Sequence, residues 1–366
     1  MCLVQQVSAH KHYDFSRMPV SEAFELTTVE QHPDRILIDE AGWVLYEFDC
    51  AASLAVFLDI RPDTDVFRTP FCYTAQTSAA KRYATLPFIE FITLFENNTA
   101  PKRIIHLFNI GHCGSTLLHH VLNESGEVWS LSELKFTFDL AMQREKLSAD
   151  LRASLARAGI NALGYYPFAK ERDVLVLKHF SQASKIYETW RAATPGATNL
   201  YLYRDALGWC NSLYGFLQRF GVPISAPLEM RHFIWYMISA ATPETVLNGI
   251  LDLNSPDLHI EDILAVGWAL HAKDFIAAQS AGLAAHAFRY NEMQADRTSV
   301  VGDILATCGF SDRSLSVALN AFDHDSHEGE VTSHDKPVLK LSTQAKQRIL
   351  NLLAHPLLSV DPEVLL

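Results

Sequence analysis

Apolar and polar positions follow two different patterns along the chain, and the change falls close to residue 100. Residues 35–48 (RILIDEAGWVLYEF) hold two apolar runs around a turn at Glu40–Gly42, which predicts a β-hairpin. Apolar positions recur at helical spacing from about Thr74 to Phe95, which predicts helix. The polar, proline-bearing stretch 97–102 (NNTAPK) then marks a boundary. We therefore predict a small α+β extension over residues 1–100.

Beyond the boundary, buried strands alternate with helices. Nearly continuous apolar runs predict strands buried on both faces, at 103–110 (RIIHLFNI), 174–178 (VLVLK), 200–203 (LYLY) and 284–290. Helical periodicity falls between and after them, at 116–123, 144–158, 209–220, 260–281 and 342–353, the last with Ser342 as its N-cap. Strands that alternate with helices form a parallel sheet flanked by helices. Residues 101–366 are therefore predicted to form one α/β domain.

Composition and charge narrow the classes of partner. Of 366 residues, 49% are hydrophobic and 20% are charged, as in a globular protein with a large core. The formal net charge of -12 disfavours nucleic acids and polyanionic acceptors, which prefer a basic surface. None of the six cysteines forms a CxxC pair, so we expect no zinc cage. The chain is too large and too poor in cysteine to be a disulfide scaffold, so we expect a reducing, cytoplasmic compartment. We also expect no signal peptide and no membrane span, since no apolar run reaches the ~20 residues that a span needs.

The clearest chemical signal is the turn that follows the first strand of the α/β domain. This strand and the next helix are joined by Gly111, His112, Cys113, Gly114, Ser115, Thr116 and Leu117. Glycine permits positive φ angles, and backbone N–H groups at a helix N-terminus attract an anion. The turn is not a Walker A motif, because serine rather than lysine follows Gly114. We therefore predict a site for a phosphate-like group without a magnesium–nucleotide clamp.

This turn resembles the 5′-phosphosulfate loop of the sulfotransferases that use 3′-phosphoadenosine 5′-phosphosulfate (PAPS). The family pattern is a strand, a loop [RK]-x-G-[ST]-[ST]-x-[LWF] and a helix, which residues 112–118 (HCGSTLL) fit with one departure. His112 stands where the family usually has arginine or lysine, the residue that stabilises charge on the bridging oxygen. The resemblance implies a P-loop NTPase-like three-layer core, PAPS as donor, 3′-phosphoadenosine 5′-phosphate (PAP) as product, and no metal.

Two later segments extend the resemblance, which covers roughly residues 103–310. Family members bind the 3′-phosphate with an arginine after a central strand and a serine about two helical turns on. Arg204 and Ser212 occupy these places here. Residues 288–293 (FRYNEM) resemble the Arg-Tyr-Glu-Asp-Leu segment that follows the last core strand, and we interpret this segment as mainly structural.

Transfer to a hydroxyl also needs a proton acceptor, and the sequence offers two main candidates. Glu133 is the first, because carbohydrate and tyrosyl-protein sulfotransferases place a glutamate in this region. Ser130 and Glu133 also fit a capping box for a helix at 131–142, so a purely structural role stays open. His179 is the second, since small-molecule sulfotransferases carry a Lys-x-His pattern at a similar strand end. Here Lys178 and His179 are adjacent, so only one of them can face the site from an extended strand.

His112 is a third catalytic candidate of a different kind. At a helix N-terminus its charged form is disfavoured, so we expect its pKa to fall. A neutral imidazole can still donate one hydrogen bond to the bridging oxygen, as a weaker stabiliser than arginine or lysine.

Other functions and partners stay open at this level. One alternative is a PAP- or nucleotide-binding protein of the same fold with weakened catalysis, and another is a P-loop kinase. We expect a small or carrier-conjugated molecule as the acceptor, and the sequence is compatible with a homo-oligomer. Residues 323–335 are rich in metal-ligand types but show no recognised ligand spacing. We interpret them as a solvated loop, or as the lid that family members close over the cofactor.

Overall fold

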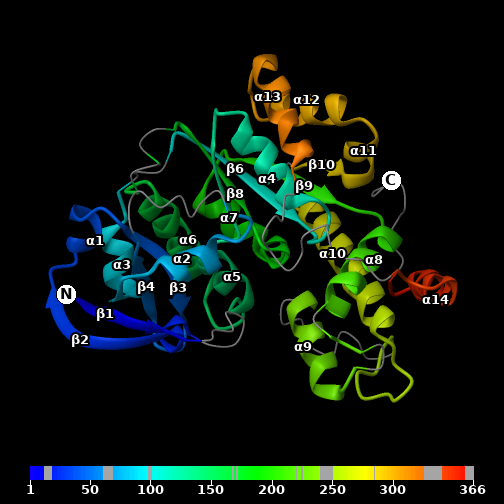
Figure 1. Cartoon of the computed structure of the whole chain (residues 1–366), viewed down its shortest axis with the longest axis horizontal. Helices are drawn as coiled ribbons and strands as arrows, with labels where there is room; N and C mark the ends of the chain where they lie inside the picture. The colour runs from blue at the N-terminus through cyan, green and yellow to red at the C-terminus, as the bar shows by residue number, and fades with distance from the viewer. Residues whose placement is uncertain are drawn as a thin grey trace.

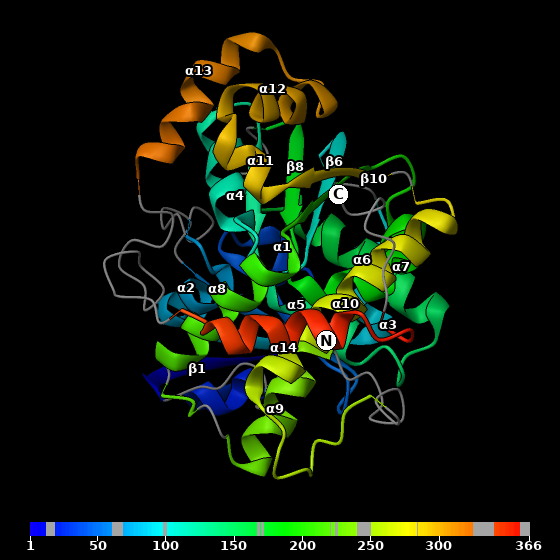
Figure 2. The same cartoon turned by 90° about the vertical axis from the view of Figure 1, so that its right-hand side faces the viewer.

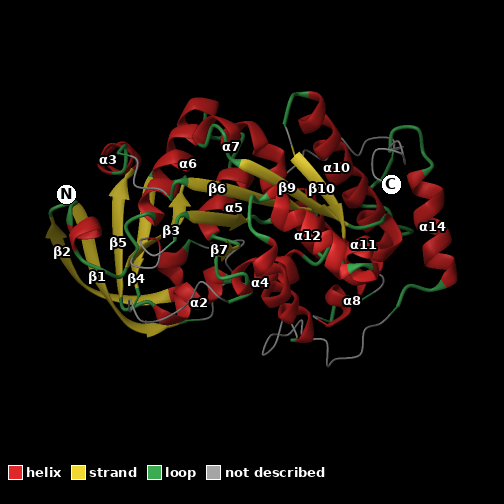
Figure 3. Ribbon diagram, turned by 90° about the horizontal axis from the view of Figure 1, so that it is seen from above, coloured by secondary structure: helices red, strands yellow, loops and turns green. Residues whose placement is uncertain are grey.

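Two five-stranded sheets organise the computed structural model of the chain, one antiparallel and one parallel (Figure 1). The structure describes residues 1–11, 19–60, 69–97, 101–166, 169, 172–219, 221–223, 226–239, 250–283, 285–324 and 340–358. The strands of the two sheets run in clearly different directions (Figure 3).

The antiparallel sheet is built from the first part of the chain. Its order is β2-β1-β5-β4-β3, with β1 (Cys2–His10), β2 (Phe24–His32), β3 (Trp43–Asp49), β4 (Leu54–Asp59) and β5 (Arg82–Pro87). Strands β3, β4 and β5 are buried over most of their length, whereas β2 is largely exposed at one edge. Short helices connect them: η1 (Val20–Ala23), α1 (Ile36–Asp39), α2 (Cys72–Ala79) and α3 (Phe88–Leu94).

The predicted hairpin over residues 35–48 is wrong. Residues Ile36–Asp39 form the short helix α1, and the hairpin at this point is β3 with β4. Gly42 lies where the chain enters β3, with a φ of +115°, and a Cβ there would lie 2.6 Å from the carbonyl oxygen of Ile60. The glycine therefore marks a close approach of two backbones and not the tip of a hairpin.

The helix predicted over residues 74–95 is only partly right. Helices α2 and α3 occupy its two ends, but β5 (Arg82–Pro87) lies between them. This strand pairs with β1 on one edge and β4 on the other, and four consecutive residues are buried, so both of its faces are covered. A short buried strand shows no alternation, which is why its apolar run is easily mistaken for one face of a helix.

The parallel sheet has the order β10-β9-β6-β8-β7, and every neighbouring pair is parallel. Its strands are β6 (Arg103–Asn109), β7 (Trp129–Ser132), β8 (Val174–Lys178), β9 (Thr198–Tyr203) and β10 (Ala285–Arg289). All the strands predicted from continuous apolar runs are present, and β7 is an addition. The predicted α/β class, with a parallel sheet flanked by helices, is confirmed.

Helices follow the strands of this sheet. They are α4 (Ser115–Glu124), α5 (Lys135–Met142), α6 (Ala149–Leu163), η3 (Ser181–Ile186), α7 (Tyr187–Ala193), α8 (Ala206–Arg219), α9 (Leu228–Ser239), α10 (Ile260–Ser280), α11 (Tyr290–Ala295), α12 (Arg297–Thr307), η5 (Asp312–Ser314), α13 (Leu315–Ala318), η6 (Leu319–Asp323) and α14 (Thr343–Leu353). Helix α14 lies against α10, while α11, α12 and α13 gather near α4 (Figure 2). The predicted N-cap is confirmed, because the Ser342 side chain accepts a hydrogen bond from the Ala345 N–H.

The capping box considered at Ser130 and Glu133 is wrong. Ser130 belongs to β7, and the next helix, α5, begins only at Lys135. Buried side chains from both sheets join in one hydrophobic cluster, and β3 packs against α5 and α6. The boundary near residue 100 stays a prediction.

Candidate functional site

The loop between β6 and α4 has an unusual backbone. Gly111, His112 and Gly114 all have positive φ angles, of 69°, 46° and 82°. A Cβ on Gly114 would overlap the ring of Tyr290, so this position requires glycine both for its conformation and for space. The Gly111 N–H donates to the side-chain oxygen of Asn109, at 2.8 Å, which fixes the start of the loop. The loop therefore has one defined shape at the carboxyl end of the sheet.

His112 is strained within this loop. Among the described non-glycine residues, positive φ angles occur at Thr28, Ser53, His112 and Glu133. Such residues persist where the surrounding structure fixes them, often at functional sites. The His112 ring packs edge-on against Phe216 of α8, with ring centroids 5.0 Å apart.

The first turn of α4 presents the polar groups that the sequence predicted. Ser115 and Thr116 are both buried there, and the first N–H groups of a helix have no partner within it. The Cys113 thiol instead points into the core, where it donates to the carbonyl oxygen of Leu202 at 3.3 Å. Burial raises the pKa of Cys113 to about 11, so this thiol is a neutral packing group. Leu117 is half-buried on the same helix.

Arg204 lies beside this loop, just after β9. Its Nη1 donates to the carbonyl oxygen of His112 at 3.4 Å, and its guanidinium lies 4.6 Å from the ring centre of Tyr290. No carboxylate pairs with it among the described residues, and its Nε is buried without a hydrogen-bond partner there. Asp205, the nearest acid in sequence, instead accepts from the Gly208 N–H and the Asn291 amide. The positive charge of the guanidinium therefore has no carboxylate partner in the described part of the chain, and several of its N–H groups are available to a ligand.

Two residues of the segment 288–293, Tyr290 and Asn291, also lie at the site. Residues 288–293 are predicted to be mainly structural, but Tyr290 lies against Gly114 and Arg204, and Asn291 donates to Asp205. Ser212 lies half-buried on α8. The predicted cofactor-binding residues therefore come from three elements at the same end of the sheet.

Glu133 and Lys178 form an ion pair at the ends of β7 and β8. The Glu133 carboxylate accepts from the Lys178 ammonium at 2.5 Å, and the Glu133 N–H donates to the Lys178 carbonyl at 2.8 Å. Glu133 has a φ of 56°, and Lys178 is 2% exposed. Strand β8 is the direct neighbour of β6, so this pair lies at the same carboxyl edge as the loop. No catalytic role for Lys178 is predicted from the sequence, although a lysine that ends a buried strand is itself a signal.

His179 lies in the core. Its Nε2 is 2.8 Å from Nδ1 of His106, and its ring packs between Phe108 and Trp190. Burial holds the pKa of His179 well below its usual range. The structure therefore places Lys178, and not His179, beside Glu133.

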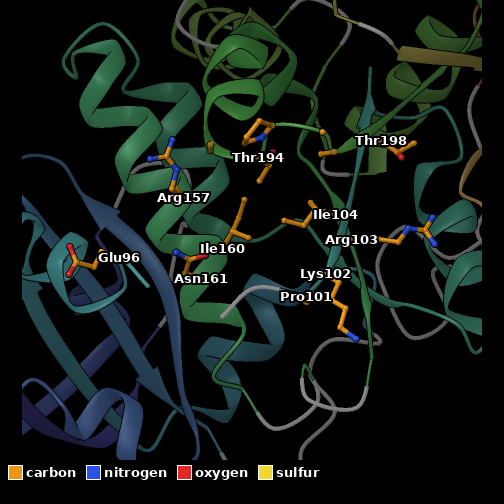
Figure 4. A pocket seen from close by; sticks show the side chains of 14 residues that line it. Glu96, Pro101, Lys102, Arg103, Ile104, Arg157, Ile160, Asn161, Thr194 and Thr198 are labelled. Carbon is orange, nitrogen blue, oxygen red and sulfur yellow. The ribbon is translucent and has the colours of Figure 1, made fainter. Parts of the chain in front are cut away.

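The opposite end of the parallel sheet contains a cavity of about 390 Å³ (Figure 4). It lies at the starts of β6 and β9, with Ile104 and Ile160 on its two sides. Its cations are already engaged: Lys102 pairs with Asp173 at 3.0 Å, and Arg157 donates to the Ala192 carbonyl at 2.8 Å. Ligands of open α/β sheets bind at the carboxyl ends of the strands, which is the other end.

No helix among the described residues has the length and apolar character of a membrane span. The described residues also contain no cluster of three His, Cys, Asp or Glu side chains arranged to hold a metal ion. The predicted lid at 323–335 lies outside the described residues from position 325 onward.

No protein-family model matches the chain, and no curated protein does. Among solved structures, the sulfotransferase STF1 from Mycobacterium tuberculosis H37Rv is similar with 13% identity and a TM-score of 0.39, over 72% of this chain and 79% of that one. The sulfotransferase STF9 from Mycobacterium avium is similar with 12% identity and a TM-score of 0.43, over 75% and 81%. At TM-scores below 0.5, function has to be argued from the residues of the site.

Proposed function

We propose that the protein is a sulfotransferase that moves a sulfuryl group from PAPS to a hydroxyl or amine of a small or carrier-conjugated acceptor. The observation that carries the proposal is Arg204: a charged guanidinium with a buried, unpartnered Nε beside a glycine loop and a helix N-terminus. Leaving a buried donor unpaired costs free energy, and a phosphate oxygen would remove that cost. All six cysteines are free thiols, which supports the cytoplasmic location that we propose with this function.

The donor-binding groups divide between two anionic parts of PAPS. The N–H groups at the start of α4, with the hydroxyls of Ser115 and Thr116, would hold the phosphosulfate. Arg204 would take the 3′-phosphate with two parallel hydrogen bonds, and Ser212 would add a third. These residues carry donors and positive potential with no carboxylate among them, so they fit a polyanionic nucleotide.

The transfer itself rests on Glu133 and Lys178. The acceptor oxygen or nitrogen forms a bond to sulfur while the bond from sulfur to the 5′-phosphate oxygen breaks, and PAP leaves with that electron pair. Glu133 takes the proton of the acceptor, a step worth ~10²–10⁴-fold in rate. Lys178 supplies a fixed positive charge at the same edge, where His112 replaces the arginine or lysine that the family resemblance implies.

Calorimetric titration of the purified protein with PAP, and with ATP plus magnesium, tests the proposal. We expect PAP to bind without magnesium, and Arg204→Ala to weaken that binding. Arg103→Ala is the matched control, because Arg103 also donates to a carbonyl and lies 5.6 Å from an aromatic ring centre, but at the amino end of the sheet.

Binding of magnesium–ATP alone would favour a kinase. PAP binding without transfer from PAPS to any of a wide set of acceptors would favour the weakened, binding-only protein.

A further inference from the structure

Three titratable side chains are buried together where the antiparallel sheet meets helix α5. Glu47 of β3, Lys135 and Asp139 of α5 are 2%, 5% and 7% exposed. Lys135 donates to Asp139 one helical turn later, and its Nζ lies 3.7 Å from a Glu47 oxygen. Buried charges are stable only when paired and hydrogen-bonded, so these groups fix one another's positions.

Backbone N–H groups of β3 and of η1 donate hydrogen bonds to this cluster. The Phe48 N–H donates to the Asp139 carboxylate at 3.0 Å, and the Val20 N–H donates to Glu47 at 2.8 Å. Helix α5 is therefore bound to the antiparallel sheet through its first two turns, at Lys135 and Asp139.

A second attachment lies on the other side of Glu133. The Ser132 hydroxyl donates to the carbonyl oxygen of Pro70 at 2.6 Å and accepts from Lys178 at 3.1 Å. Ser132 and Lys135 thus hold the chain to Pro70 and Glu47 on both sides of Glu133. Only Glu133 and Leu134 lie between the two attachments, and Glu133 has the left-handed backbone conformation that needs external support.

We propose that the antiparallel sheet positions the base: Lys135, Asp139 and Glu47 hold Glu133 in register with Lys178. This inference rests on the proposed function, and it gives residues 1–95 a role in transfer. Replacing a buried ionic cluster by apolar groups is often neutral or stabilising, so its presence points to a requirement for one fixed geometry. Lys135, Asp139 and Glu47 are positioning residues, since they act through Glu133.

The test compares three variants of the full-length protein. Asp139→Asn keeps an acceptor for the Phe48 N–H but removes the charge, and Lys135→Met removes the cation with a side chain of similar length. Asp59→Asn is the matched control, because it breaks an ion pair of the same sheet, with Arg82 at 2.7 Å, that joins β4 to β5 and not β3 to α5. Each variant is assayed for PAP affinity, for kcat and KM with PAPS, and for hydrogen exchange of a peptide over 129–142.

We expect the Asp139 and Lys135 variants to bind PAP like the wild type, which shows that they fold. Their kcat should fall about 10–100-fold with little change in KM, since a displacement of ~1 Å can cost on the order of 10²-fold. The Glu133 N–H, which donates to Lys178, should exchange faster in both variants and not in Asp59→Asn.

Other outcomes overturn the proposal. Unchanged kcat and exchange in both cluster variants would show that Glu133 is held by β7 and β8 alone. An equal loss of kcat in Asp59→Asn would show a general loss of stability and no positioning. If the wild type neither binds PAP nor transfers sulfate, the proposed function fails, and the exchange measurement still decides whether the cluster holds residue 133.

Discussion

The two ends of the parallel sheet use similar residues for different purposes. At the amino end, Arg103 donates to the Cys308 carbonyl and stacks on Phe310, beside a cavity of about 390 Å³. At the carboxyl end, Arg204 donates to a loop carbonyl and stacks on Tyr290, with its Nε unpartnered. The comparison shows that a cavity whose charged side chains already have partners is a weaker sign of function than unpaired hydrogen-bond donors around a strained loop.

The largest expected effect is at Glu133, whose ion pair with Lys178 is buried, unlike the exposed pair of Lys102 and Asp173 at the amino end. Glu133→Gln removes the proton acceptor while it keeps an oxygen for Lys178, so kcat should fall ~10²–10⁴-fold with PAP affinity unchanged. Steady-state kinetics and PAP titration of one preparation measure both quantities. A variant that kept the wild-type kcat would show that another residue is the base.

The two arginines give the next contrast. Arg204→Ala should raise the Kd for PAP about 10–100-fold, since charge-assisted hydrogen bonds are worth about 1.5–3 kcal/mol and each 1.4 kcal/mol is tenfold. Arg103→Ala should leave this Kd unchanged. Equal Kd values for the two variants, measured by calorimetry, would contradict the assignment of the 3′-phosphate.

Two glycines with positive φ sharpen the same contrast. Gly196 lines the amino-end cavity with a φ of 87° and open space around it, whereas Gly114 faces Tyr290. Gly196→Ala should cost about 1–2 kcal/mol of unfolding free energy from its backbone alone, with PAP binding intact. Gly114→Ala should cost more and also weaken PAP binding, because Tyr290 has to move. Chemical denaturation with and without PAP distinguishes these results.

The last expected effect is a pH dependence at Glu47. Burial raises the pKa of Glu47 to about 8; Asp139 and Asp49 add to the shift, and Lys135 opposes it. The folded carboxyl then holds its proton while the unfolded one, near 4.5, loses it, so the unfolding free energy should fall between about pH 4.5 and 8. Tyr83 also faces this group, but its pKa is raised above that range. Glu47→Gln should reduce this fall, as denaturation at several pH values would show. An identical pH dependence in the two proteins would contradict it.

Features that depend on a single continuous stretch of the chain could be predicted from the sequence. The loop at Gly111 to Leu117 is a short continuous motif, and the apolar runs of β6 and β8 are long enough to predict a parallel sheet. The position of Arg204 follows from its place after a strand, which a single stretch of sequence contains.

The remaining features depend on contacts between distant residues. Glu133 and Lys178 are 45 positions apart, and Phe48 and Asp139 are 91 apart. Neither pair leaves a periodicity or a motif. Strand β7 is only four residues long, so its apolar run is too short to tell from the start of a helix.

The strand order has a consequence for synthesis of the chain. Every strand of the antiparallel sheet lies before residue 88, whereas the central strand β6 pairs with β9 nearly a hundred residues later. A ribosome therefore releases the complete antiparallel sheet before it has made Lys135 or Asp139, and local contacts form faster than distant ones. In this order of events, the antiparallel sheet folds first, and the segment that contains Glu133 packs against it as that segment leaves the ribosome.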